Sequence, residues 1–97
     1  MVQINWTFQA KKDLQNIFAF ISKDSKIYAK HQIKKIISAT QMIKKHPEIG
    51  RIVPELKRHE IREIIEGNYR IIYKIVSKNQ IDILTVHHSS RNFLIKT

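Results

Sequence analysis

The sequence contains no cysteine, only two glycines and two prolines, and few acidic residues. Without cysteine, the chain has no disulfide, no thiolate metal site and no cysteine nucleophile. The scarcity of glycine and proline argues against a linker or a low-complexity protein. Among the eight Asp and Glu residues, no spacing supports a catalytic carboxylate dyad. Phosphate-binding loops, dinucleotide fingerprints, zinc-protease helices and nucleophile elbows are also absent from the sequence.

Long hydrophobic runs are missing as well. The N-terminus lacks the charged region and apolar core of a signal peptide, and no run approaches membrane-spanning length. These absences predict a soluble, cytoplasmic protein with no membrane partner. A length of 97 residues and a hydrophobic fraction of 42% predict a single domain over residues 1–97 with its own core.

Positive charge is what the chain has in excess. Lys and Arg number 18 against 8 acidic residues, which gives a formal net charge of +10. Such a charge attracts anions, so nucleic acid, an acidic protein and an anionic membrane surface would each qualify as partners. A solvated basic surface with no specific partner is the alternative.

Hydrophobic periodicity predicts a strand and two helices in the first half of the chain. Residues 2–6 alternate as in a strand with one buried face. Thr7 is expected to cap a helix that runs to about Lys23, and Ser25 a second helix that ends before Pro47. The short joint makes the two helices an antiparallel hairpin. The apolar stripes are Ala10, Leu14, Ile17, Phe18 and Ile21, then Ala29, Ile33, Ile36, Ile37, Thr40 and Ile43.

The second half predicts three strands in an antiparallel meander. Gly67-Asn68 is expected to form a two-residue hairpin turn, and Lys78-Asn79 turns the chain again. The middle strand is the most apolar and is therefore expected at the centre of the sheet. The strands are predicted at residues 61–65, 69–76 and 80–87.

The order β-α-α-β-β-β predicts an α+β fold, with the helical hairpin packed on one face of a small antiparallel sheet. Residues 48–58 form a connector, in which Pro54 favours a loop or an edge strand. The helices must cover one sheet face to bury their apolar stripes. The other face is expected to stay uncovered, and function is expected there.

Three arginines are candidates for that uncovered face. Arg62 and Arg70 lie on neighbouring predicted strands, and Arg91 follows the last strand. Guanidinium grips phosphate or carboxylate with a paired fork. Because Arg70 is a charge in an otherwise apolar strand, we expect its replacement by alanine to weaken function more than folding. The alternative is that each arginine pairs with a local acid such as Glu60, Glu63, Glu66 or Asp82.

Histidines and tyrosines lie close to these arginines in the sequence. His87 and His88 point to opposite faces of a strand, so only one of them can serve as general acid or base beside Arg70. Structural or solvent-exposed roles are the alternative for both. The histidines show no metal-ligand spacing, so no metal and no cofactor are expected. Tyr69 and Tyr73 share a face and are expected in the core, with base stacking as the alternative.

Taken together, these residues resemble the RelE/ParE superfamily of bacterial type II toxins over nearly the whole chain. The resemblance implies the fold above, a small acidic antitoxin encoded next to this protein, and growth inhibition when the toxin is free. The segments that carry it are Ala10-x-x-Asp13-Leu14-x-x-Ile17-x-x-Phe20-Ile21, His46-Pro47-x-x-Gly50-Arg51, Arg62-Glu63-Ile64, Gly67-Asn68-Tyr69-Arg70-Ile71-Ile72-Tyr73 and Ile83-Leu84-x-Val86-x-His88-x-x-Arg91.

Within the superfamily, the sequence is more similar to ParE-like members, which look like inhibitors of DNA gyrase with no chemistry of their own. The pattern Gly-Arg, Arg-Glu, Tyr-Arg and His-x-x-Arg carries this similarity. The resemblance implies gyrase as the target. It also implies that the target is bound by Arg51, Arg62, Tyr69, Arg70, His88 and Arg91.

Two other functions are kept as alternatives. RelE-like members look like ribosome-dependent mRNA endonucleases. On this hypothesis Arg70, His88 and Arg91 are the catalytic residues and act without a metal. The partners are then the ribosome and mRNA. RelE-like sequences tend to have lysines where this chain has Ile61 and Glu63, which favours the ParE-like branch. The third reading is a non-toxic basic module that binds nucleic acid or an acidic protein.

Overall fold

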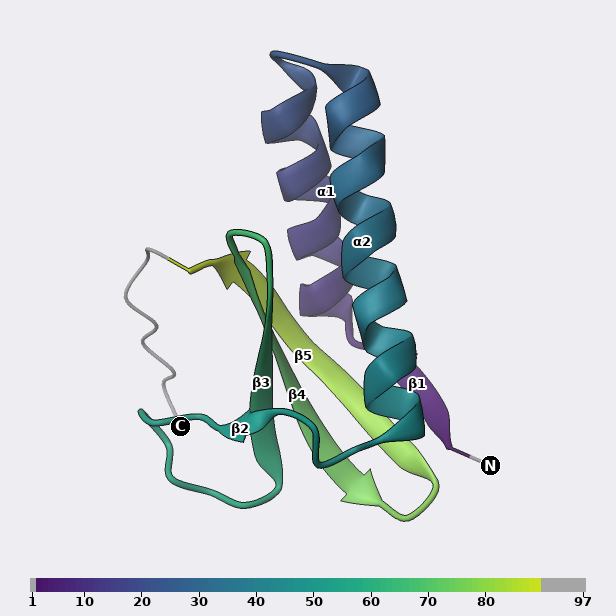
Figure 1. The fold of residues 1–97 in the computed structure, drawn as a ribbon, viewed down its shortest axis with the longest axis vertical. Coiled ribbons are helices and arrows are strands. Elements are labelled where there is room, and N and C mark those ends of the chain that lie inside the picture. The colour runs from purple at the N-terminus through teal and green to yellow at the C-terminus, as the bar shows by residue number, and fades with distance from the viewer. Residues whose placement is uncertain (1, 90–97) are drawn as a thin grey trace.

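In the computed structural model, which describes residues 2–89, two helices pack on one face of a five-stranded sheet (Figure 1). The predicted order of helices and strands is confirmed, and the connector adds one very short strand. The elements are β1 (Gln3–Trp6), α1 (Phe8–Ser22), α2 (Lys26–Lys45), β2 (Arg51–Ile52), β3 (Ile61–Glu66), β4 (Tyr69–Ser77) and β5 (Gln80–His88).

Both helices begin at the predicted capping residues. The Thr7 hydroxyl accepts a hydrogen bond from the Ala10 backbone N–H at 3.2 Å, and the Ser25 hydroxyl accepts one from Tyr28 at 3.1 Å. Each bond satisfies a backbone donor that the first helical turn leaves without a partner. No helix among residues 2–89 is long and apolar enough to cross a membrane, because α2 has the length but is rich in lysine.

The strands lie in the order β1-β5-β4-β3-β2, so β4 is central as predicted. Neighbours from β2 to β5 pair antiparallel, whereas β1 pairs parallel to β5. The sheet is therefore mixed rather than purely antiparallel. β1 and β5 are joined through nearly the whole chain, so no tight turn forces them to run in opposite directions.

The turn between β3 and β4 has two residues, and Glu66 pairs with Tyr69 across it. Gly67 adopts a φ of +60°, whereas Asn68 does not have a positive φ. Positive φ at the first central residue alone is the pattern of a type II′ turn, which matches the twist of the flanking strands. The predicted turn is confirmed, and it fixes the register of β3 on β4.

The main core lies between the hairpin and the sheet. Ile36 and Ile43 of α2 are fully buried, as are Ile71 and Tyr73 of β4. Burial of each such side chain contributes about 1.5–3 kcal/mol. The hairpin is longer than the sheet, and its far half projects past the β3–β4 turn (Figure 1).

Tyr73 ties the end of α2 to the sheet. Its hydroxyl donates to the Pro47 carbonyl at 2.6 Å and accepts from the Gly50 backbone N–H at 3.0 Å. Burial raises the pKa of this phenol above its ordinary value. A side chain at Gly50 has no space, because its Cβ would lie 2.6 Å from the Glu63 carbonyl and 2.7 Å from the Tyr73 hydroxyl.

We expect Gly50→Ala to lower the free energy of unfolding by about 1–3 kcal/mol, because the added methyl forces β2 away from β3. Urea denaturation followed by circular dichroism measures the change. Ser38→Ala, on the exposed surface of α2, is the control and should stay within about 0.5 kcal/mol. Equal midpoints for the two variants would contradict the close packing at Gly50.

Candidate functional site

The sheet face opposite the helices is partly covered by the connector, not bare as predicted. Val53 is fully buried there against Ile61 and Ile72, and Leu56 and Leu84 pack around them. The protein thus has a second, smaller apolar cluster on the face where function was expected. Hydrophobic periodicity could not predict this cluster, because Val53 and Leu56 lie in a loop that has no regular repeat.

Arg70 lies beside this cluster and is only 8% exposed. Its guanidinium donates to Glu63 through Nε at 3.0 Å and Nη2 at 2.6 Å. It also donates to Glu55, in the connector, through Nη1 at 3.0 Å and Nη2 at 3.1 Å. Two carboxylates therefore grip Arg70, each with two hydrogen bonds. The expectation that its guanidinium is displayed on an uncovered face is wrong.

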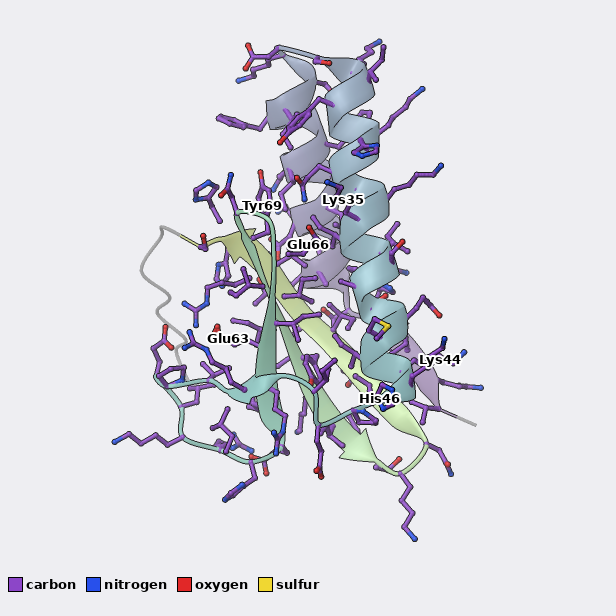
Figure 2. The ribbon with its side chains drawn as sticks, viewed as in Figure 1. Lys35, Lys44, His46, Glu63, Glu66 and Tyr69 are labelled. Carbon is purple, nitrogen blue, oxygen red and sulfur yellow. The ribbon has the colours of Figure 1, made fainter. Side chains whose placement is uncertain are left out.

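Glu63, labelled in Figure 2, contacts two arginines, and its side chain is fully buried. Arg51, from β2, reaches it with an Nη2–Oε2 distance of 3.4 Å while its own side chain stays largely exposed. The four side chains of Arg51, Arg70, Glu55 and Glu63, here called the ion cluster, balance their formal charges. The ion cluster therefore contributes no net charge to this sheet face.

Hydrogen bonds shift the pKa values of two members of the ion cluster, Glu55 and Arg70. The bonds from Arg70 lower the pKa of Glu55 below its ordinary value. Bonds to Glu55 and Glu63 in turn raise the pKa of Arg70, so the guanidinium stays charged throughout the accessible range. Neither group of this pair is suited to exchange a proton near neutral pH.

Arg62 lies on the sheet face that the helices cover, where it pairs across the strands with Tyr73. Its guanidinium donates to backbone carbonyls of the connector, at 3.0 Å for Gly50, 3.1 Å for His59 and 3.5 Å for Glu48. These contacts hold both ends of the connector against β3. Arg62 does not come together with Arg70, since alternate residues of a strand point to opposite faces.

The two histidines of β5 are separated in the same way. In the register of β4 on β5, His87 lies across from Arg70 and His88 lies across from Tyr69. The rings of Tyr69 and His88 are packed edge to face, with their centroids 5.5 Å apart. Tyr69 and His88 line a groove of ≈ 560 Å³ beside α1, together with Asp13. Tyr69 is buried in the main core, as predicted.

The structure therefore divides the predicted target-binding residues among three places. Arg51 and Arg70 meet in the ion cluster, Tyr69 and His88 meet in the groove beside α1, and Arg62 lies apart. Arg91 falls outside the described residues. The constellation expected for RNA cleavage is not assembled in residues 2–89, because Arg70 and His88 are on opposite faces.

A second groove, of ≈ 660 Å³, runs between α2 and the edge of β3. Its apolar part includes Met42, Ile49 and Ile65, which are 46–54% exposed. Lys35 on α2 and Glu66 on β3 face it from its two sides (Figure 2). We call it the edge groove. Among residues 2–89, no group of three acidic or histidine side chains is placed to hold a metal ion.

The alternative that an arginine pairs with a local acid is confirmed for Arg70 and Glu63, whereas sequence reasoning missed the contact of Glu55 and the edge groove. Glu63 could have been singled out from the predicted turn, since a two-residue turn at Gly67 places it opposite Ile72 and diagonal to Arg70 on the same face. No sequence signal places Glu55, because the connector has no regular register. The edge groove depends on how α2 crosses the sheet, which a single sequence does not specify.

Comparison with solved structures identifies the fold. A chain of the chromosomal ParDE toxin–antitoxin system from P. aeruginosa superposes with a TM-score of 0.74 at 19% identity, covering 91% of this chain and 96% of that one. A chain of the toxin–antitoxin complex RelBE2 from Mycobacterium tuberculosis gives 0.64 at 19% identity, covering 90% and 96%. The protein thus has the fold of the RelE/ParE superfamily.

The family itself follows from the sequence profile. Residues 4–93 match the family described as "ParE toxin of type II toxin-antitoxin system, parDE". The chain therefore belongs to the ParE toxin family of type II toxin–antitoxin systems, which confirms the predicted branch. No individual curated protein matches the chain.

Because Glu63 is fully buried, we now expect Arg70→Ala to reduce stability strongly, by about 3–5 kcal/mol. The double variant Arg70→Met/Glu63→Leu should recover most of this loss, since it leaves no unpaired charge in the buried position and the remaining Arg51 and Glu55 side chains reach water. Urea unfolding midpoints measure both. Arg58→Ala, which breaks the exposed Arg58–Glu60 pair, is the control, with an expected cost below about 1 kcal/mol. An Arg70→Ala variant as stable as the control would refute a structural role.

The lowered pKa of Glu55 predicts a pH-dependent contribution to stability. The ion pair stabilises the fold above the unfolded pKa, near 4.5, and its contribution is lost as the pH falls through the lower folded value. The difference in unfolding free energy between the wild type and Glu55→Gln, up to about 1 kcal/mol for so exposed a pair, should shrink between about pH 6 and pH 3. A difference that stays constant over this range would show that Glu55 does not act through its charge.

Proposed function

We propose that this toxin arrests growth by binding and blocking DNA gyrase, without chemistry of its own. The observation that carries the proposal is the state of Arg70, whose guanidinium is occupied by Glu55 and Glu63. Cleavage of RNA by the predicted route needs that guanidinium at the phosphate, with His88 beside it. A surface that binds a protein target needs neither.

The residues proposed to contact gyrase act in different ways. Arg51 is the exposed arginine of the ion cluster, and its contact with the buried Glu63 holds its guanidinium near the surface of this face. An arginine that is both accessible and preorganised is a common anchor in protein interfaces. Arg62 and Arg70 support the same surface by holding the connector. Tyr69, at the start of β4, and His88, at the end of β5, stay in the proposed set. Arg91, which falls outside the described residues, stays in it on the resemblance alone.

We further propose that the edge groove receives the antitoxin. Its floor is apolar, and Lys34 and Lys35 line it, so it suits an acidic segment with apolar anchors. β2 pairs only with Arg62 and Glu63, and among residues 2–89 no strand pairs with the outer edge of β3 from Ile64 to Glu66. An extended antitoxin segment has backbone groups to pair with at that edge.

Since gyrase acts in the bacterial cytoplasm, we propose that the protein acts there as well.

Two assays test the target. Purified toxin added to gyrase should inhibit supercoiling of relaxed plasmid, and the same preparation added to translating ribosomes should leave mRNA uncut. Failure to inhibit gyrase at large molar excess, together with ribosome-dependent cuts, would overturn the gyrase proposal and assign the RelE-like activity instead. Inactivity in both assays by a protein that also fails to arrest growth would favour the non-toxic basic module.

A pair of arginine variants localises the contact. We expect Arg51→Ala to raise the concentration for half-inhibition of supercoiling about tenfold, as for an interface anchor worth about 1–2 kcal/mol. Arg58→Ala is the matched control, because Arg58 is also an exposed arginine in an ion pair, and it should change inhibition less than about threefold. Equal effects would show that overall charge, not Arg51, drives binding.

A further inference from the structure

The net positive charge of the protein is concentrated in its helical layer. The segment of residues 8–45 contains nine lysines and two aspartates, a surplus of seven out of the formal +10. All five arginines and most of the acids come later in the chain, where the ion cluster balances four of the charges. The largest uncompensated charge is therefore not on the sheet face where function was expected.

The lysines of the hairpin are exposed and have no ion-pair partner within residues 2–89. Eight of the nine are exposed, Lys44 being the exception. Within residues 2–89, the positively charged member of every ion pair is an arginine. Asp13, the acid within the helices, points inward and accepts hydrogen bonds from Thr85 Oγ1 at 2.6 Å and Val86 N at 3.0 Å. Asp24 lies in the joint between the helices.

Three of these lysines form a regular row on α2. Lys26, Lys30 and Lys34 recur every fourth residue, so they share one face of the helix with a rise of about 6 Å between neighbours. Nitrogen-tipped side chains project from α2 away from the sheet (Figure 2). The far half of the hairpin also projects past the sheet (Figure 1), so an extended ligand can lie along it without meeting the strands.

The chemistry of the row favours nucleic acid over a membrane. A helix that lies on a membrane needs a continuous apolar face, and the main apolar stripe of α2, with Ile36 and Ile43 fully buried, faces the core. The apolar side chains that α2 leaves exposed near the row are Ile27, Tyr28 and Ile37, so the test includes a membrane as a competing ligand. Lysine is a point charge that contacts phosphates without selecting a base, whereas specific base contacts most often use arginine forks. Regularly spaced, unpaired lysines suit the regularly spaced phosphates of a duplex.

We infer that the outer face of the hairpin, along Lys26, Lys30 and Lys34, binds the phosphate backbone of duplex DNA without sequence specificity. This activity goes beyond the proposed block of gyrase and needs no gyrase. It gives the toxin a contact surface on the helical layer, which meets the edge groove at Lys34.

The test compares two triple variants of equal charge. Lys26→Gln/Lys30→Gln/Lys34→Gln and Lys57→Gln/Lys74→Gln/Lys78→Gln each remove three positive charges from the formal +10, the first from the hairpin and the second from the connector and sheet. Binding to a short fluorescent duplex of arbitrary sequence is measured by anisotropy over a series of salt concentrations, without gyrase. Thermal unfolding confirms that both variants are folded.

We expect the hairpin variant to lose about 10- to 100-fold in affinity at low salt, and the slope of log K against log salt to flatten by about two to three units. The sheet-side variant should stay within about threefold of wild type. Equal losses in the two variants would overturn the inference, since net charge alone would then explain binding. Binding to phosphatidylserine vesicles but not to the duplex would overturn it as well and assign the surface to a membrane.

Because the assay contains no gyrase, its failure is distinct from a failure of the proposed target. The hairpin variant can also be added to the supercoiling assay. A variant that no longer binds the duplex but still blocks gyrase would leave both conclusions intact as independent properties of the two surfaces.

Discussion

The buried carboxylate of Glu63 is the constraint on which the rest of this structure depends. A charge removed from water costs several kcal/mol unless it is paired and hydrogen-bonded. Arg70 from β4 and Arg51 from β2 supply the pairing, and Arg70 in turn holds Glu55 of the connector. One side chain of β3 is thereby tied to three other segments. The two-residue ladder between β2 and β3 is too short to hold the connector on the sheet by itself.

This pairing also decides where the protein presents charge. The arginines that were expected to bind the target are largely committed within the fold, either to Glu55 and Glu63 or, for Arg62, to backbone carbonyls. The lysines of the hairpin have no such partners among residues 2–89. The surfaces therefore differ in character, with a charge-balanced sheet face, an apolar groove at the edge of β3 and a cationic helical layer.

Much of the fold was predictable because its signals are local. Thr7 and Ser25 cap the helices, and Gly67 makes the turn that sets the register of β3 on β4. The parallel pairing of β1 was not predictable, because it joins distant segments with no turn to define it. The site was predicted less well, since it depends on an irregular connector that carries Glu55 onto the sheet face. The pairing of Arg70 with Glu63 was one of the alternatives, and the register set by the Gly67 turn favours it, because it places the two residues diagonally on one face.

The inward-facing carboxylate of Asp13 connects the two layers of the protein. It binds Thr85 and Val86 where β5 carries one extra residue relative to β4, so it holds α1 to an irregular part of the sheet. His87 and His88 follow directly in the chain. Thr7, at the start of α1, also donates to the carbonyls of Ile83 and Leu84, so α1 is anchored on both sides of this irregularity. The position of the two histidines relative to the sheet is thus tied to the helical layer as well as to β4.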